Sequence, residues 1–308
     1  MKITTGIAGV ASAAALLGTG FTGASAVEAS PYIIGGSEAK SPWIVQLNFN
    51  SYEQSGTFGC TGEQLNDEWV LTAKHCTDGS YNMQVFQSND QNNPGEAING
   101  DRFFEAPEGD IALIHLSKSA PLSQYASLNL DYSIKENTRG DIYGYGMGAN
   151  KSYTDTLRTA QVSVIGESTD AYNGLAVHLR GFNGASNHGD SGGPLVINGK
   201  VVAVCSTGDQ ADPGANINAQ SNYAVLAQSA DWIESTTGIH YGNDAETPAS
   251  PVVTEPPTPT APVVNPTDPV GTDWSDPWSD SWPDSWSDSW SDSWSNSWSD
   301  SWEISRWS

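Results

Sequence analysis

The sequence predicts an all-β domain that ends in one short helix. Short runs of β-branched and aromatic residues, such as Trp69-Val70-Leu71, recur between clusters of Gly, Asn, Ser and Pro. The pair Asn198-Gly199 separates two such runs and favours a two-residue β-hairpin. The stretch from Ile33 to Gly242 has about 210 residues, enough for one domain of two packed halves. The strand pattern alone indicates a sandwich or a barrel.

The individual elements follow from local patterns along the chain. Apolar β-rich runs predict strands over residues 43–47, 69–71, 195–197 and 201–204. Near the end of the domain, Val225-Leu226 and Trp232-Ile233 have helical spacing and predict the C-terminal helix.

The first 26 residues have the pattern of a secretory signal peptide. Met1-Lys2 precedes a stretch poor in charge from Ile3 to Phe21, and Ala24-Ser25-Ala26 is a small-x-small cleavage site. The apolar run is short and interrupted by Gly and Thr, so we expect no membrane span. We therefore expect a secreted, extracellular protein in which residues 27–32 form a pro-segment.

Two low-complexity segments follow the domain. Residues 243–271 are rich in Pro, Thr and Val and predict a semi-rigid linker. Residues 272–308 repeat Trp-Ser-Asp with a Trp at every fourth position. An extended strand would place these Trp side chains on one face, suited to cell-wall, carbohydrate or cell-surface contact. The alternative, which the composition favours, is a disordered tail with no fixed partner.

The formal net charge of −24 disfavours nucleic-acid binding, because phosphate contact needs basic surface. The sequence predicts neither a metal site nor a cofactor. The remaining functional signal is a set of three motifs. They are Thr72-Ala73-Lys74-His75-Cys76, Asp110-Ile111-Ala112-Leu113-Ile114 and Gly189-Asp190-Ser191-Gly192-Gly193-Pro194.

Each motif supplies one residue type that acyl transfer needs. A serine hydroxyl is a weak nucleophile unless a base is adjacent. Imidazole titrates near neutrality and can take and return a proton. A buried carboxylate orients the imidazole and stabilises its protonated form. We expect Ser191 to be the nucleophile, His75 the base and Asp110 the orienting acid.

Together the motifs resemble the chymotrypsin/trypsin-like serine endopeptidases, over roughly residues 33–240. The resemblance implies two antiparallel six-stranded β-barrels with the active site in the cleft between them. It also implies protein or peptide substrates, and an oxyanion hole formed by the amides of Gly189 and Ser191.

The resemblance further implies a disulfide between Cys60 and Cys76, which lies beside the expected base. Cys205 is left over, and we expect it to be a buried thiol; the alternative is an intermolecular disulfide.

Ile33-Ile34-Gly35-Gly36 is similar to the mature N-terminus of the family. There, cleavage frees an ammonium group that turns inward and pairs with the acid before the nucleophile, here Asp190. The residue before the cut is Tyr32 rather than a basic residue, which argues against a trypsin-like activator.

The resemblance also indicates the specificity pocket. Ala185, followed by Ser186, occupies the position where trypsin-like members carry an aspartate, and Ser206-Thr207-Gly208 matches the substrate-binding strand. Without a carboxylate at its base, the pocket favours uncharged apolar or aromatic side chains. The alternative is that Asp209 or Asp212 reaches the pocket and restores a basic preference.

Three functions therefore compete. The first is an active secreted endopeptidase, which the complete set of motifs favours. The second is a protease-shaped binding protein without catalysis. The third is a surface adhesin whose Trp-rich tail carries the main function.

Overall fold

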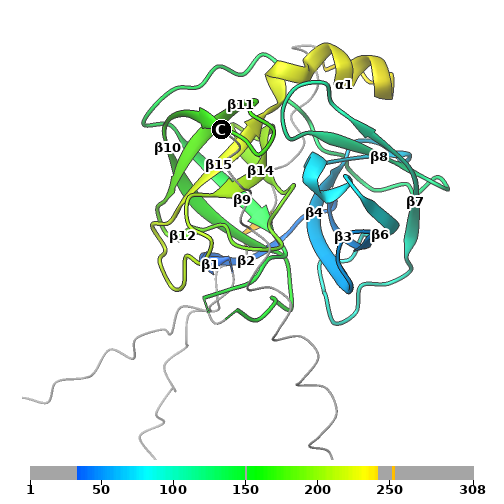
Figure 1. Ribbon diagram of the computed structural model, residues 1–308, viewed down its shortest axis with the longest axis horizontal. Coiled ribbons are helices and arrows are strands. Elements are labelled where there is room, and N and C mark those ends of the chain that lie inside the picture. The colour runs from blue at the N-terminus through cyan, green and yellow to red at the C-terminus, as the bar shows by residue number, and fades with distance from the viewer. Residues whose placement is uncertain (1–32, 150, 242–251, 254–308) are drawn as a thin grey trace, which may run out of the picture.

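The computed structural model describes residues 33–149, 151–241 and 252–253, which form two neighbouring β-barrels (Figure 1). The first barrel is closed, with strand order β3-β4-β5-β8-β7-β6. Its strands are β3 (Ile44–Ser51), β4 (Thr57–Gln64), β5 (Trp69–Thr72), β6 (Ser80–Phe86), β7 (Ile98–Glu105) and β8 (Ala112–Leu116).

The second barrel has strand order β11-β15-β14-β13-β9-β10 and is closed by the pairing of β10 with β11. Its strands are β9 (Arg139–Gly144), β10 (Arg158–Thr169), β11 (Leu175–Gly181), β13 (Pro194–Ile197), β14 (Lys200–Gly208) and β15 (Gln220–Val225). All strand pairs in both barrels are antiparallel. The predicted two-barrel, all-β fold is confirmed.

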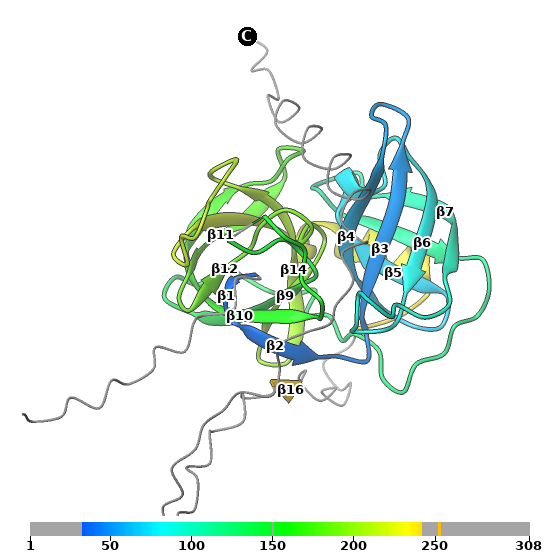
Figure 2. The ribbon, with the colours of Figure 1, turned by 90° about the horizontal axis from the view of Figure 1, so that it is seen from below.

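Short elements join the barrels and cover their ends. Figure 2 shows β2 (Ser37–Lys40) beside β10, leading toward the first barrel. The two-residue strand β16 (Val252–Val253), from the range expected to be a linker, pairs with β2. The other short strands are β1 (Ile34–Gly35) and β12 (Gly184–Ala185), which pair with each other.

The strands, hairpin and helix expected from local patterns are all present. Asn198 (φ 52°) and Gly199 (φ 76°) form the tight turn between β13 and β14, and both have the positive φ that this hairpin type requires. Near the end of the domain, the 3₁₀ turn η2 (Leu226–Ser229) leads into α1 (Ala230–Thr237). Gly238 ends α1 in the left-handed conformation, with its amide bonded to the Glu234 carbonyl.

The core consists of three groups of buried side chains. One fills the first barrel and includes Val45 and Ile114, and another fills the second barrel and includes Val162 and Leu195. The third lies between the barrels and joins residues of both, such as Leu71 and Tyr143, to α1. The two halves are therefore packed as one unit.

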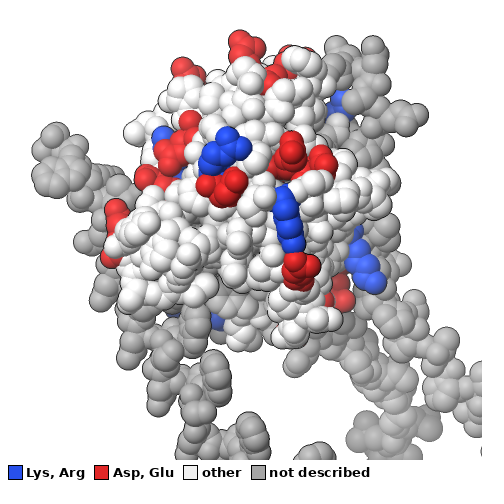
Figure 3. Space-filling view, turned by 90° about the vertical axis from the view of Figure 1, so that its right-hand side faces the viewer, with Lys and Arg blue, Asp and Glu red and all other residues white. Residues whose placement is uncertain are grey.

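The face drawn in Figure 3 is mostly uncharged, with acidic and basic side chains interspersed. It therefore offers no broad basic surface of the kind that nucleic acids need.

Several predicted segments lie outside the described residues: the signal peptide (1–26), the pro-segment (27–32), the Trp-Ser-Asp repeat (272–308) and most of the linker. Within the described residues, no helix is long and apolar enough to cross a membrane.

Candidate active site

His75 and Asp110 are held together by the pairing of β5 with β8. His75 lies in the short 3₁₀ turn η1 (Lys74–Cys76) after β5, and Asp110 lies just before β8. The His75 amide donates to Asp110 Oδ1 at 2.9 Å, and His75 Nδ1 lies 2.7 Å from Asp110 Oδ2. Asp110 is fully buried. This contact fixes the orientation of the imidazole ring.

The pair shifts the pKa of both of its members. Burial alone would lower the pKa of His75, but the charge and hydrogen bond of Asp110 outweigh it and raise that pKa. Burial alone would raise the pKa of Asp110, but the attraction of His75 outweighs it and holds the pKa below its ordinary value. The geometry therefore stabilises a protonated imidazole beside an ionised carboxylate.

Ser206 braces Asp110 from the second barrel. Its hydroxyl donates to Asp110 Oδ2 at 2.7 Å, and Ser206 belongs to β14. We expected Ser206 only among the substrate-binding residues. Its hydrogen bond to Asp110 was not predicted from the sequence.

Ser191 lies in a turn that packs closely on the first barrel. The Thr61 amide donates to the Ser191 carbonyl at 2.8 Å, and Thr61 Oγ1 donates to the Gly189 carbonyl at 3.0 Å. Gly192 has φ 77°, and a Cβ there would lie 2.5 Å from the Thr61 carbonyl oxygen. Only glycine allows the turn to approach β4 this closely.

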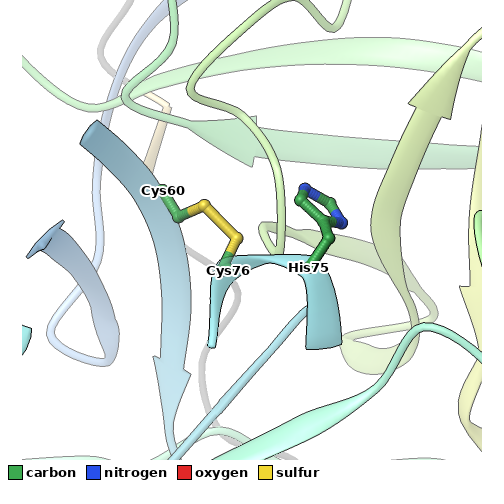
Figure 4. A group of neighbouring side chains, drawn as sticks. All are labelled: Cys60, His75 and Cys76. Carbon is green, nitrogen blue, oxygen red and sulfur yellow. A yellow bond between two sulfur atoms is a disulfide. The ribbon is translucent and has the colours of Figure 1, made fainter. Parts of the chain in front are cut away.

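The predicted Cys60–Cys76 disulfide is present and joins β4 to η1. Figure 4 shows the His75 side chain next to the disulfide, and His75 directly precedes Cys76 in the chain. Cys60, His75 and Cys76 are close enough to suggest metal ligands, but both sulfurs are already bonded to each other. Because β4 also holds Ser191 through Thr61, one strand tethers both Ser191 and His75.

A pocket of about 320 Å³ opens beside Ser191. Ser186, Ser206 and Gly208, which we expected to bind the substrate, are among the residues that line this pocket. Ala185, which we expected at the base of the pocket, is not among the described lining residues; it lies in β12, where it pairs with Ile34.

Of the described residues that line this pocket, Asp209 is the one that carries a carboxylate. Its carboxylate is already engaged by His178 Nε2 at 2.9 Å and by Asn222 Nδ2 at 3.0 Å. Asp212 does not line the pocket and instead pairs with Lys151 at 2.7 Å. The described wall of the pocket thus carries one carboxylate, and two hydrogen bonds from neighbouring side chains already occupy part of it.

Cys205 is a free, buried thiol, as expected, and it also lines the pocket. Burial raises the pKa of this thiol to about 12, so it is neutral at physiological pH. No local sequence pattern indicates that Cys205 lies in the pocket, because the orientation of its side chain depends on how β14 packs against β13 and β15.

Asp190 is a second buried acid beside Ser191. Its carboxylate accepts hydrogen bonds from the amides of Gly146 and Asn187, each at 2.8 Å. Burial raises the pKa of Asp190 to about 7. Ile33, the expected partner after cleavage, is also fully buried.

The histidines outside the three motifs have ordinary hydrogen-bond partners. The contacts are His115 with Asp101, His178 with Asp209, His188 with the Ala211 carbonyl, and His240 with Glu234.

Two antiparallel β-barrels, with a buried His–Asp pair and a serine turn that are both tethered to β4, define the class of chymotrypsin-like serine proteases. The family model described as Trypsin matches residues 33–233, and the chain belongs to this family. It is a serine endopeptidase, a hydrolase.

Relatives agree with this assignment. Trypsin-3 of Salmo salar is 31% identical over 228 residues, which cover 66% of this chain and 92% of that protein. Trypsin of Sus scrofa is 29% identical and covers 63% of this chain and 90% of its own length. Among solved structures, neuropsin, a serine protease expressed in mouse brain, has a TM-score of 0.54 at 26% identity, covering 66% of this chain and 98% of its own.

Proposed function

We propose that this endopeptidase cleaves peptide bonds through a triad of Ser191, His75 and Asp110. The observation that carries the proposal is the buried His75–Asp110 pair, in which Nδ1 lies 2.7 Å from Oδ2. It leaves Nε2 as the ring nitrogen that can act on Ser191. The tether of both Ser191 and His75 to β4 supports the same assignment.

In the proposed reaction, Ser191 Oγ attacks the substrate carbonyl while His75 takes the hydroxyl proton. The developing oxyanion accepts hydrogen bonds from the amides of Gly189 and Ser191. His75 then returns the proton to the leaving amine, and an acyl-enzyme remains. Water, activated by the same imidazole, releases the acid product. Asp110 keeps the imidazole in one tautomer and stabilises its protonated state.

The pocket beside Ser191 supports a preference for uncharged substrate side chains. Ser186, Cys205 and Ser206 contribute only neutral groups to it. Within the part of the chain that the structure describes, a cationic side chain buried in the pocket would find one acidic lining residue, Asp209, and that carboxylate is already bonded to His178 and Asn222. Kinetics on matched Tyr, Leu, Ala, Lys and Arg substrates test this. A higher kcat/KM for Arg than for every uncharged substrate would refute it.

We also propose that the protein is exported as a precursor and activated by cleavage before Ile33. The raised pKa of Asp190 supports this, because a buried acid without a cation gains from the arrival of an ammonium group. N-terminal sequencing of the active form tests the cleavage site. Full activity in a chain that still begins before Ile33 would exclude this mechanism.

The triad is tested by Ser191→Ala, with Ser55→Ala at an exposed loop position as the matched control. Loss of the nucleophile typically lowers kcat about a millionfold in related triads. A serine-directed phosphonate should label the wild-type protein and the Ser55→Ala control but not Ser191→Ala. Hydrolysis and labelling that persist in Ser191→Ala would show that another residue is the nucleophile. A wild-type protein that neither hydrolyses peptides nor takes the label would favour a binding or adhesive function.

A further inference from the structure

We propose that residues 170–174, the turn between β10 and β11, position the His75–Asp110 pair from the second barrel. This inference rests on the proposed triad. We call these residues the 170–174 turn, and we assign Asp170 and Tyr172 as positioning residues that act through Asp110 and His75.

Asp170 fixes the backbone of Asp110. It is 6% exposed, and its Oδ2 accepts a hydrogen bond from the Asp110 amide at 3.0 Å. Its Oδ1 accepts from the amides of Tyr172 and Gly174, each at 2.9 Å. One carboxylate therefore shapes the turn and holds the residue that carries the orienting acid.

The backbone of the turn also orients Ser206. The Ala171 amide donates to Ser206 Oγ at 3.0 Å, and Ser206 Oγ donates to Asp110 Oδ2 at 2.7 Å. A hydroxyl has one proton to give. With Ala171 occupying a lone pair of the oxygen, that proton is directed at Asp110.

Tyr172 contacts the segment of the first barrel that carries His75. Its hydroxyl donates to Asp78 Oδ2 at 2.9 Å, and Lys74 Nζ lies 4.7 Å from the centre of its ring. Lys74 is in turn paired with Glu105 at 3.3 Å. Lys74 and Asp78 flank His75 in the sequence, so Tyr172 ties η1 of the first barrel to the second barrel.

The backbone of the 170–174 turn packs so closely on Gly109, the residue before Asp110, that position 174 has no room for a side chain. A Cβ on Gly174 would overlap the Gly109 Cα and lie 2.6 Å from both Asp170 Oδ2 and Gln228 Oε1. Gln228 Oε1 also accepts from the Leu175 amide at 2.8 Å, which fixes the exit of the turn. The turn is therefore in direct contact with the backbone that precedes Asp110.

A turn that only joined two strands would not need these contacts. Its own closure is provided by the Asp170 amide, bonded to the Gly174 carbonyl at 3.0 Å. The bonds to Asp110, Ser206 and Asp78 are additional. One reaches the proposed acid Asp110 itself, one reaches Ser206, which bonds to Asp110, and one reaches Asp78, which follows the proposed base His75 in the chain.

The test uses Tyr172→Phe, which removes the bond to Asp78 and keeps the ring, and Gly174→Ala, which pushes the turn away from Gly109. Tyr52→Phe is the matched control, because Tyr52 is 79% exposed and stacks on Tyr81. We expect Tyr172→Phe to lower kcat about fivefold, as for one lost hydrogen bond, with little change in KM. Gly174→Ala should lower kcat up to about a hundredfold through misplacement of the pair.

The second readout is the titration of His75. The contact with Asp110 raises the pKa of His75, so loosening it should lower that pKa. The acid limb of the kcat/KM profile should then move to lower pH in both turn variants but not in Tyr52→Phe. NMR titration of the His75 ring in the Ser191→Ala background measures the same shift without activity.

The outcomes separate the two proposals. If wild-type hydrolysis does not depend on Ser191, the triad fails, while the NMR titration still tests the turn. If Gly174→Ala does not fold, Tyr172→Phe decides. A Tyr172→Phe protein with wild-type kcat and an unshifted His75 titration would overturn the positioning role.

Discussion

Glu63 is an acidic residue in apolar surroundings. It lies on β4 opposite Ile44 and Leu71, which both belong to the buried group between the barrels. Its side chain is fully buried, and neither carboxylate oxygen has a hydrogen-bond partner among the described residues. Burial raises the pKa of Glu63 well above its ordinary value. The folded protein therefore favours the neutral acid.

We predict that Glu63→Met stabilises the protein at neutral and alkaline pH. A raised folded pKa means that the folded state binds more protons than the unfolded state, so this group lowers stability as pH rises above the unfolded pKa. Removing a buried, unsatisfied polar group should add about 1–3 kcal/mol. Thermal unfolding across pH 4–9 checks this, with Glu63→Gln as the variant that removes the charge and keeps the polarity. A midpoint that does not rise in Glu63→Met at pH 8 would contradict it.

Asp190 should make the precursor and the cleaved protein respond differently to pH. Its pKa is about 7 when Ile33 is not a free terminus, against an ordinary 3.8, so the precursor should lose stability as pH rises through this window. In the cleaved form the Ile33 ammonium would lower the pKa of Asp190 and remove that loss. The difference should be on the order of a few kcal/mol, since each pKa unit corresponds to about 1.4 kcal/mol.

Thermal midpoints of both forms at pH 4.5 and 7.5 measure this difference. The comparison cancels contributions from acids such as Glu63 that both forms share. Uncleaved Asp190→Asn serves as the control and should lack the Asp190 part of the pH slope. Identical slopes in the two wild-type forms would show that Asp190 has no new partner after cleavage.

At the residue scale, the sequence predicted those site residues that belong to a recognisable local motif. Ser191, His75 and Asp110 each lie in such a motif, and the structure places His75 against Asp110 as expected. Asp170 and Thr61 could not be found in this way. Their roles depend on which strands of the two barrels face each other, and no local spacing encodes that.

Among the elements, β4 holds two parts of the proposed site in place. It holds the Ser191 turn through Thr61 and is joined to η1 by the Cys60–Cys76 disulfide. Removing the disulfide should therefore affect both stability and catalysis.

We predict that the double variant Cys60→Ala/Cys76→Ala loses about 3 kcal/mol of unfolding free energy, the value for a loop of roughly this length. The kcat should fall more than KM changes, because η1 would position His75 less well. Denaturant unfolding and steady-state kinetics measure the two effects. Wild-type protein under a mild reductant is the control, and it should approach the variant. Unchanged stability in the double variant would mean that the strands alone hold η1.

Local patterns predicted the elements whose turn chemistry is explicit, and they carried no signal for pairing between distant segments. The Asn198-Gly199 hairpin and the C-terminal helix follow from local sequence. Strand β16 lies in the range expected to be an extended linker, and its pairing with β2 was not predicted. That pairing joins residues more than two hundred positions apart, which local patterns do not report.

For the whole molecule, strand patterns indicated only a sandwich or a barrel. The closure of each barrel depends on one pairing, β3 with β6 in the first and β10 with β11 in the second. The two-barrel expectation came from family resemblance. The buried group between the barrels explains why the halves stay aligned, since residues such as Leu71 and Tyr143 pack together from both sides.

The net charge of −24 gives a prediction that concerns the whole chain. A chain that ends after residue 253 lacks the Trp-Ser-Asp repeat and much of the acidic charge, but it keeps every residue placed at the proposed site. Its kcat/KM for a short neutral peptide should match that of the full chain within about twofold, because such a substrate feels little electrostatic steering.

A basic protein substrate should respond differently. At low ionic strength the full chain should cleave it faster than the shortened one, since the larger negative charge raises the encounter rate. In about 1 M salt, where the screening length falls to about 3 Å, the two rates should converge. The neutral peptide is the control within each condition. A tenfold loss on that peptide would place the tail within the catalytic unit, and equal rates on the basic protein at low salt would show that the charge of the tail does not steer substrates.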